Sequence, residues 1–350
     1  MGVRESMTAD GSLGAPSTTA LLAAAEALQA ALPREALAFD MPLASLGRWR
    51  IGGPADLVAT PGDVAQLRAI LAIISQHKLP YVIVGDGSNL LFDDAGFRGV
   101  VLRIGRAFGS FTIDEDGVVE AGAGLWVPSF VRQVIGAGMA GATHAIGIPG
   151  TLGGLITMNG GSQRRGIGEN VTSVDLIGRD GIFRRVEHAE LEFSYRRSAL
   201  QAGHDIVISA RFRFEPSSRD LLRREAITIL ASRRAKFPRV RANCGSVFVS
   251  DPALYNLIGS PGMAIEKAGL KGASIGEAQL SPEHANFIVN NGSARSRDVL
   301  ALVKLARSRV EALTGIAMDA EVRHLAPDGT IRPAHDVPAS LVRGSQELVQ

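Results

Sequence analysis

YVIVGDGSNLL, residues 81–91, is the stretch that decides the fold. Four mainly apolar residues lead into Gly85, which is typical of a short buried strand that ends in a tight turn. The Gly-x-Gly that follows looks like the start of a dinucleotide-binding loop, but Leu90 stands where that fingerprint needs its third glycine. The segment therefore argues against a Rossmann fold.

The residues after this loop also lack the helix that a Rossmann loop would open. Residues 92–99 contain two aspartates and two glycines, which is turn chemistry. A phosphate at the loop would be held by backbone N–H groups and by the side chains of Ser88 and Asn89, without a helix dipole. The motif alone leaves a second interpretation open, which is a tight turn between two strands.

A second glycine-rich segment, GIPGTLGG at residues 147–154, favours the phosphate interpretation. Pro149 stiffens the segment, and its four glycines let the backbone approach a flat or charged ligand closely. The chain holds 40 glycines among 350 residues, and most of the excess lies between Gly85 and Gly168. Two such loops suit a long cofactor with a diphosphate in its middle.

The remaining hydrophobic pattern mixes helices and strands. Residues 63–77 have helical spacing, and Asp63 can cap them. Residues 206–214 end in the alternation of a strand with one wet face. Further helices are expected at residues 19–32, 127–136, 219–236, 257–268 and 297–313, the last capped by Gly315. Further strands are expected at residues 99–104, 111–113, 118–121, 171–177, 183–186, 286–290 and 321–324.

Composition narrows the class of protein. A net charge of +2 argues against a nucleic-acid partner. The single cysteine, Cys244, cannot form an internal disulfide. No apolar run reaches the roughly 18 residues that span a membrane, and Glu26 interrupts the N-terminal run that might pass for a signal peptide. No His/Asp/Glu group has metal-ligand spacing. We therefore expect a cytoplasmic monomer without a metal.

Eight segments together resemble a known family. GDGSNLL, AGAG and GIPGTLGG are similar to the FAD-binding domain of the vanillyl-alcohol-oxidase (PCMH) type. The rest resembles the UDP-N-acetylenolpyruvoylglucosamine reductases (UDP-N-acetylmuramate dehydrogenases), in their second type. The matching segments, in the family's order, are RIGGPAD (residues 50–56), YRRS (195–198), CGSVF (244–248), AIEKAGLKG with IGEAQLSPEHANFIVN (within 264–290) and AEVR (320–323).

The resemblance implies an α+β fold, with a two-subdomain FAD-binding module followed by an α/β substrate-binding domain. We expect a tail and short helix in residues 1–40 and a flexible tail in residues 327–350. Between them we expect FAD-binding subdomains in residues 41–104 and 105–216 and the substrate domain in residues 217–326. The implied cofactors are FAD and NADPH, and the implied substrate is a UDP-sugar bearing an enolpyruvyl group.

The implied reaction is an NADPH-dependent flavoprotein reduction of that enolpyruvyl double bond, in peptidoglycan precursor synthesis. It needs a group that stabilises negative charge on the substrate carboxylate and an acid that protonates the adjacent carbon. By resemblance, Arg196 stabilises the charge, Ser246 donates the proton, and Glu321 acts with Arg196 or on the proton relay. A guanidinium suits the first role because it binds a carboxylate through two parallel hydrogen bonds.

The resemblance also implies binding residues. The cofactor would contact Gly85, Asp86, Gly87, Ser88, Asn89, Leu90, Ala123, Gly147, Ile148, Pro149, Gly150, Thr151, Gly153, Gly154 and Val207. The substrate would contact Tyr195, Arg234, Lys236, Gln279, His284 and Asn286. Arg234 and Lys236 belong to a basic cluster with Arg233, Arg239 and Arg241, which suits phosphate groups or, in the alternative, forms a solvated helix face.

The chain departs from the family's pattern at three places. MNGGSQRRGIGE (residues 158–169) replaces a segment close to MNAGAYGGE, VSD (249–251) replaces more polar residues, and Glu277 replaces a common glycine. These departures leave two alternatives open. One is a paralogue that reduces a different enolpyruvyl ether or unsaturated acid in specialised metabolism, and the other is a flavin oxidase of the same superfamily.

Overall fold

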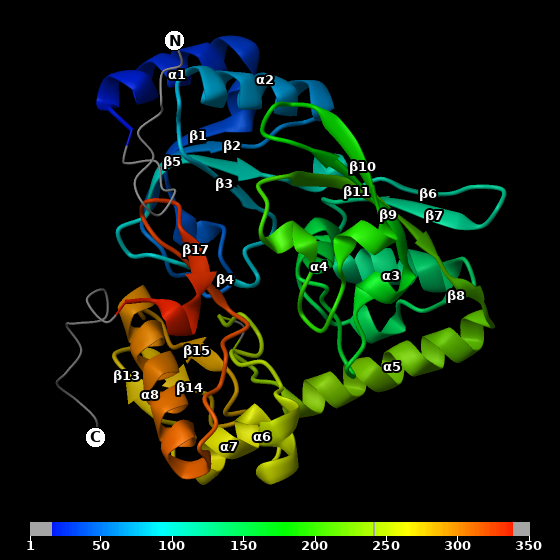
Figure 1. Ribbon diagram of the computed structural model, residues 1–350, viewed down its shortest axis with the longest axis vertical. Helices are drawn as coiled ribbons and strands as arrows, with labels where there is room; N and C mark the ends of the chain where they lie inside the picture. The colour runs from blue at the N-terminus through cyan, green and yellow to red at the C-terminus, as the bar shows by residue number, and fades with distance from the viewer. Residues whose placement is uncertain (1–15, 241, 339–350) are drawn as a thin grey trace.

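Residues 16–240 and 242–338 are described by the computed structural model (Figure 1). Two sheets with their helices occupy the upper part of the view, and a smaller mixed lobe lies below them. Helices and strands contribute to every part, so the α+β prediction is confirmed. Within these ranges, no helix combines the length and the apolar character that crossing a membrane requires.

The first sheet has the strand order β1-β2-β5-β3, with β2 and β3 parallel to β5 and β1 antiparallel to β2. Two helices cover one face of it (Figure 1). The predicted cap is confirmed, because the Asp63 carboxylate accepts a hydrogen bond from Gln66 N at 2.8 Å. The elements are α1 (Thr18–Ala31), β1 (Leu37–Pro42), β2 (Pro54–Ala59), α2 (Val64–Gln76), β3 (Tyr81–Val84) and β5 (Phe97–Arg103).

β1 corrects the expectation that residues 1–40 hold only a tail and a helix. It begins at Leu37 and forms the edge strand of the first sheet. The run LAFDMP is short and mixed in polarity, so periodicity does not reveal it as a strand.

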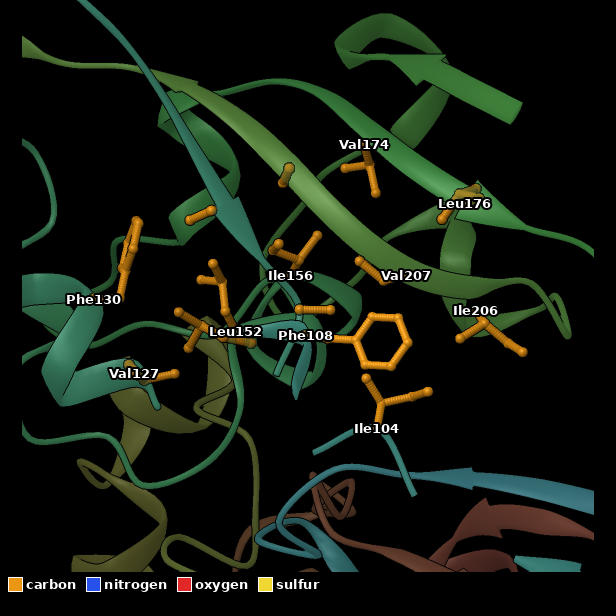
Figure 2. Packing of buried hydrophobic residues seen from close by; sticks show 14 of the residues in the cluster. Ile104, Phe108, Val127, Phe130, Leu152, Ile156, Val174, Leu176, Ile206 and Val207 are labelled. Atoms are coloured by element: carbon orange, nitrogen blue, oxygen red, sulfur yellow. The ribbon is translucent and has the colours of Figure 1, made fainter. Parts of the chain in front are cut away.

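The second sheet is antiparallel with the order β10-β9-β11-β7-β6. Its strands lie where the sequence predicts them: β6 (Phe111–Ile113), β7 (Val118–Gly122), β9 (Val171–Ile177), β10 (Phe183–Glu187) and β11 (Ile206–Arg213). Helices α3 (Val127–Gly136) and α4 (Leu152–Thr157) pack on it, beside a small pair formed by β8 (Met139–Ala140) and β12 (Glu215–Pro216). Figure 2 shows the core between these helices and the sheet.

A single long helix, α5 (Arg219–Lys236), connects the second sheet to the lower lobe (Figure 1). The lobe contains α6 (Pro252–Leu257), α7 (Pro261–Lys267), β13 (Ser274–Ile275), β14 (Ala278–Leu280), β15 (Ile288–Asn290) and α8 (Ser296–Thr314). The helix predicted at residues 257–268 is present as α7 but begins only at Pro261, because Gly259 at φ 108° and Pro261 separate it from α6, which the sequence did not indicate. Gly315 caps α8 as predicted, with φ 73°.

A small sheet joins the upper and lower parts. It has the order β17-β16-β4 and contains β4 (Leu90–Phe92), β16 (Arg323–Leu325) and β17 (Ile331–Pro333). The expectation of a flexible tail is corrected for residues 327–338, because β17 pairs with β16 and Ala334 is fully buried in the core of the lobe. Residues 1–15 and 339–350 of the predicted tails lie outside the described residues.

Candidate active site

The two predicted cofactor loops lie against each other, and we call residues 85–90 and 147–154 the glycine cradle. A Cβ added to Gly85 would lie 2.2 Å from Thr151 Oγ1, and one added to Gly150 would lie 2.8 Å from Ser88 Oγ. Side chains at these two glycines would push the loops apart. The cradle therefore depends on residues without a Cβ.

Part of the cradle's backbone, in residues 86–89, is free to bind an anion. Gly87 has φ 57° and Gly150 has φ 132°, conformations that residues with side chains rarely adopt. Among the described residues, none accepts a hydrogen bond from the backbone N–H groups of residues 86–89. Successive unpaired amides in a turn form a concave anion site, so the cradle fits a diphosphate.

Asp86 adds a carboxylate oxygen without a hydrogen-bond donor to the cradle. Its Oδ2 is buried and accepts no hydrogen bond from the described residues, and Arg48 Nη1 lies 3.6 Å away. Burial raises the pKa of this carboxyl, and the charge of Arg48 opposes that rise. A buried carboxylate oxygen without a donor fits an O–H or N–H group of a bound ligand.

Two further predicted cofactor residues lie behind the cradle. Gly153 N donates to Ala123 O at 2.8 Å, and a Cβ on Gly153 would lie 3.0 Å from the Ala123 Cβ. Val207 on β11 is buried in the core drawn in Figure 2. Ala123, whose N donates to Ile208 O of β11 at 2.8 Å, therefore links the cradle to the second sheet.

Arg233 is a site residue that the sequence did not single out from its basic cluster. A Cβ on Gly147 would lie 2.5 Å from its Nε, and its guanidinium carbon lies 4.5 Å from the centre of the Phe237 ring. Burial lowers the pKa of Arg233 to about 10. No carboxylate among the described residues pairs with it, whereas its neighbours Arg234 and Lys236 are exposed. A half-buried cation without an anion fits a phosphate ligand.

Two residues predicted to be catalytic meet, although they lie far apart in the sequence. Arg196 Nε lies 2.9 Å from Glu321 Oε1, and both side chains are mostly buried. The Nε–H is not aligned with this oxygen for a hydrogen bond, so the contact is an ion pair. Burial raises the pKa of Glu321, and Arg196 opposes the rise. The sequence analysis placed Glu321 on the last strand, but β16 begins two residues later, at Arg323.

A strained turn aims Arg196. Ser194 and Arg197 exchange backbone hydrogen bonds at 3.0 and 3.1 Å, and Arg196 between them has φ 59°. Its Nη2 donates to Gly161 O at 2.6 Å, and its Nη1 donates to Asn159 O at 3.4 Å. Backbone carbonyls, which carry no net charge, therefore fix two nitrogens of the guanidinium, while Glu321 pairs with the third at Nε.

Those carbonyls belong to residues 158–169, which we call the 158–169 loop. Its base is closed by a hydrogen bond from Ile167 N to Gly160 O at 3.0 Å. The Asn159 side chain donates to Ser194 O at 2.7 Å and accepts from Gly168 N at 2.9 Å. The segment that departs from the family's pattern thus forms the support of Arg196.

Ser246 lies on a segment that pairs with the chain around Glu321. Glu321 N donates to Val247 O at 2.8 Å, and an isolated bridge pairs Phe248 with Ala320. Ser246 is half-buried, and its hydroxyl makes no hydrogen bond with the described residues. Ser246 and Glu321 therefore lie on two segments in backbone contact, and Arg196 lies on a turn from which its side chain reaches Glu321.

The remaining predicted substrate residues differ in their surroundings. Tyr195 lines a cavity of about 310 Å³ together with residues of the 158–169 loop. Asn286 is buried, and its amide bonds both the N–H and the C=O of Phe248. Gln279 donates to Gly272 O within its hairpin, and His284 packs edge-on against Phe287. Asn286 thus supports the segment that carries Ser246.

His144 is a second residue that the sequence analysis missed. It is 1% exposed, neither ring nitrogen has a hydrogen-bond partner among the described residues, and its carbonyl accepts from Ser162 Oγ at 2.5 Å. Burial, followed by the charge of Arg165, lowers its pKa to about 4. It is therefore a neutral residue beneath the 158–169 loop, and only the strong burial of its segment distinguishes it.

Comparisons with known proteins agree with both halves of this arrangement. A family model described as the FAD binding domain matches residues 55–187. A second, described as the UDP-N-acetylenolpyruvoylglucosamine reductase C-terminal domain, matches residues 237–325. Helix α5 lies between the two matched ranges.

Curated relatives match over most of their length. UDP-N-acetylenolpyruvoylglucosamine reductase 1 of Corynebacterium glutamicum is 45% identical over 315 residues, covering 89% of this chain and 94% of that protein. The corresponding reductase of Heliobacterium modesticaldum is 41% identical, covering 82% and 90%. The crystal structure of the reductase from Thermus caldophilus superposes with a TM-score of 0.69 at 30% identity, covering 81% of this chain and 97% of that one.

Proposed function

Because this chain belongs to the UDP-N-acetylenolpyruvoylglucosamine reductase family, we propose that it reduces the enolpyruvyl group of UDP-N-acetylenolpyruvoylglucosamine to give UDP-N-acetylmuramate for peptidoglycan. The observation that carries this proposal is the contact between Arg196 and Glu321. It assembles a charge-stabilising site from two domains that the sequence holds far apart.

The glycine cradle would hold the cofactor. When bound, FAD supplies the substrate with a hydride that it has taken from NADPH. The free N–H groups of residues 86–89 would contact the diphosphate. Asp86 Oδ2, which faces Arg48 but accepts no hydrogen bond from the described residues, would accept one from the cofactor.

Arg196 would stabilise the charge that develops on the substrate carboxylate. Two of its five N–H groups donate to carbonyls, which leaves donors for a carboxylate. Because the guanidinium is fixed before the substrate arrives, little reorganisation is needed as the charge grows. Preorganised donors of this kind contribute roughly 3–4 kcal/mol to transition-state stabilisation.

Ser246 would deliver the proton to the carbon next to that carboxylate, while the hydride reaches the terminal carbon. A serine hydroxyl is a weak acid and needs an activating neighbour. Glu321 is available for this role, because burial raises its pKa and lets it hold a proton more readily than an exposed glutamate. The backbone pairing of residues 247 and 321 keeps the two groups in one region.

Phosphate groups would be bound along the end of α5. Arg233 is half-buried and lacks a carboxylate partner in the described part of the chain, so it is the strongest candidate. Arg234, Lys236, Tyr195, Gln279 and His284 remain proposed substrate contacts, whereas Asn286 would act by supporting the Ser246 segment. We further propose that the protein works in the cytoplasm, since the buried thiol of Cys244 needs no oxidising compartment. We also propose that it is a monomer.

Steady-state turnover tests this function. Purified protein is assayed for NADPH oxidation without oxygen, with and without UDP-N-acetylenolpyruvoylglucosamine, and the product is identified by mass. We expect oxidation only with this substrate and one UDP-N-acetylmuramate per NADPH. Absence of stimulation would favour a different unsaturated acid. NADPH-independent oxygen consumption would favour an oxidase.

A further inference from the structure

The tip of the 158–169 loop contacts the lower lobe. The guanidinium carbon of Arg164 lies 4.8 Å from the centre of the Tyr255 ring, which belongs to α6. Tyr255 is 47% exposed, so the core does not fix its position. A cation over an exposed ring changes an equilibrium by about two- to fivefold. This is too little to hold a fold together but enough to bias a local movement.

The loop backbone is shaped to make this contact. Gln163 and Arg164 are consecutive residues in the left-handed region, with φ 57° and 64°. Residues with side chains rarely adopt this conformation, and such strain persists where surrounding contacts hold it. Here the base of the loop is closed by Ile167 and Gly160, so the strain lies at the tip that presents Arg164.

The contact joins the two segments that carry the proposed chemistry. On one side, the carbonyls of the 158–169 loop hold Arg196, and Arg164 lines the same cavity as Tyr195. On the other side, α6 follows the Ser246 segment and is capped by Asp251, whose carboxylate accepts from Ala253 N at 2.7 Å. A movement of α6 away from the loop would break this contact between the two sides of the site.

One partner, Arg164, lies at a departure from the family's pattern, and the other lies on the helix that follows a second departure. Arg164 falls in residues 158–169, and Tyr255 is on the helix that begins directly after residues 249–251. Arg164 and Tyr255 are far apart in the sequence, yet their side chains meet in space.

We propose that Arg164 and Tyr255 form a latch that holds α6 against the 158–169 loop and so narrows the entrance to the substrate site. Both are positioning residues, because they act through the segments that carry Arg196 and Ser246. The latch opens to admit the UDP-sugar and closes around it. Its loss is therefore expected to weaken substrate binding more than it slows the chemical step. The substrate in this proposal is the one assigned under the proposed function.

Hydrogen exchange of the protein without substrate tests the latch itself. The variants are Arg164→Ala and Tyr255→Ala, with Tyr255→Phe as the variant that keeps the ring. Arg179→Ala is the matched control. The guanidinium carbon of Arg179 lies 5.5 Å from the centre of the Tyr81 ring, and neither residue lines the cavity beside the 158–169 loop. We expect the backbone amides of α6 to exchange about two- to fivefold faster than in the wild type in Arg164→Ala and Tyr255→Ala, and at the wild-type rate in the other two variants. Unchanged exchange of α6 in both Arg164→Ala and Tyr255→Ala would overturn the proposal.

Kinetics then test the role of the latch. In Arg164→Ala and Tyr255→Ala, KM for UDP-N-acetylenolpyruvoylglucosamine is expected to rise about two- to fivefold with kcat nearly unchanged. The double variant should be no worse than either single variant, because one contact is lost in all three. Additive effects, or a fall in kcat alone, would refute the positioning role. If the wild-type protein ignores this substrate, the proposed function fails while the exchange experiment still decides the latch.

Discussion

The glycine cradle and the 158–169 loop both contain residues with left-handed backbone, but these residues are glycines in the cradle and residues with side chains in the loop. The cradle has glycines there, at Gly87 and Gly150. The loop has Asn159, Gln163 and Arg164. In the cradle, the missing side chain lets a ligand approach the backbone. In the loop, the side chains and carbonyls are the working parts, and hydrogen bonds hold the strained backbone that aims them. Left-handed residues therefore mark two different tasks in one site.

The largest effect is expected at Arg196, whose guanidinium is oriented by the carbonyls of the 158–169 loop. Arg196→Gln removes the charge that would stabilise the substrate carboxylate, so kcat should fall by about 100- to 1000-fold. FAD content and flavin reduction by NADPH should stay unchanged, because the cradle is intact. Arg197→Gln is the control, since this neighbour is exposed. A fall of less than tenfold, or loss of flavin, would show that the two regions are not separate.

A smaller effect is expected beneath the loop, at His144. The unfolded chain protonates this histidine near pH 6.5, whereas the folded protein resists protonation until about pH 4. Acidification therefore favours the unfolded state. Because of His144, the free energy of unfolding should fall by about 2 kcal/mol between pH 7.5 and pH 5. In urea titrations, the free energy of unfolding of His144→Phe should fall less than that of the wild type over this pH interval, by the same amount. Parallel pH curves for the two proteins would contradict the account.

The smallest effect is expected in the cradle. Gly150→Ala forces a Cβ into a left-handed residue and places it 2.8 Å from Ser88 Oγ. The strain alone corresponds to about 5- to 30-fold weaker binding of FAD. FAD affinity is measured by fluorescence after removal of the flavin, with kcat determined at saturating FAD. Gly136→Ala is the control, because a Cβ there meets open space. Unchanged affinity would mean that the loops can separate without cost.

The two segments of the cradle stand out in the sequence because glycine marks them directly, and the structure places them against each other. Two glycine-rich segments, each next to a regular element, place a ligand site without knowledge of the fold. The strands of the second sheet were equally accessible, since their apolar runs are bounded by turn residues. β1 and β17 were missed because both are short and carry mixed residues, so that only pairing with a neighbour reveals them.

The support of Arg196 could not be predicted in the same way. Resemblance pointed to Arg196 and Glu321, but nothing in the spacing indicates that Asn159 and Gly161 would hold the guanidinium through their carbonyls. Backbone acceptors leave no trace in side-chain chemistry. Arg233 was hidden for another reason, since five basic residues look alike until the fold buries one of them.

The central claim is that the cofactor and the substrate are served by different residues of one site. Rapid mixing tests it directly. Wild-type protein and Ser246→Ala are reduced with one equivalent of NADPH without oxygen and then mixed with UDP-N-acetylenolpyruvoylglucosamine, while flavin absorbance is followed. We predict equal reduction of both proteins by NADPH, with rapid reoxidation by substrate in the wild type and none in the variant. Reoxidation of Ser246→Ala at the wild-type rate, or failure of both half-reactions with flavin still bound, would contradict the account.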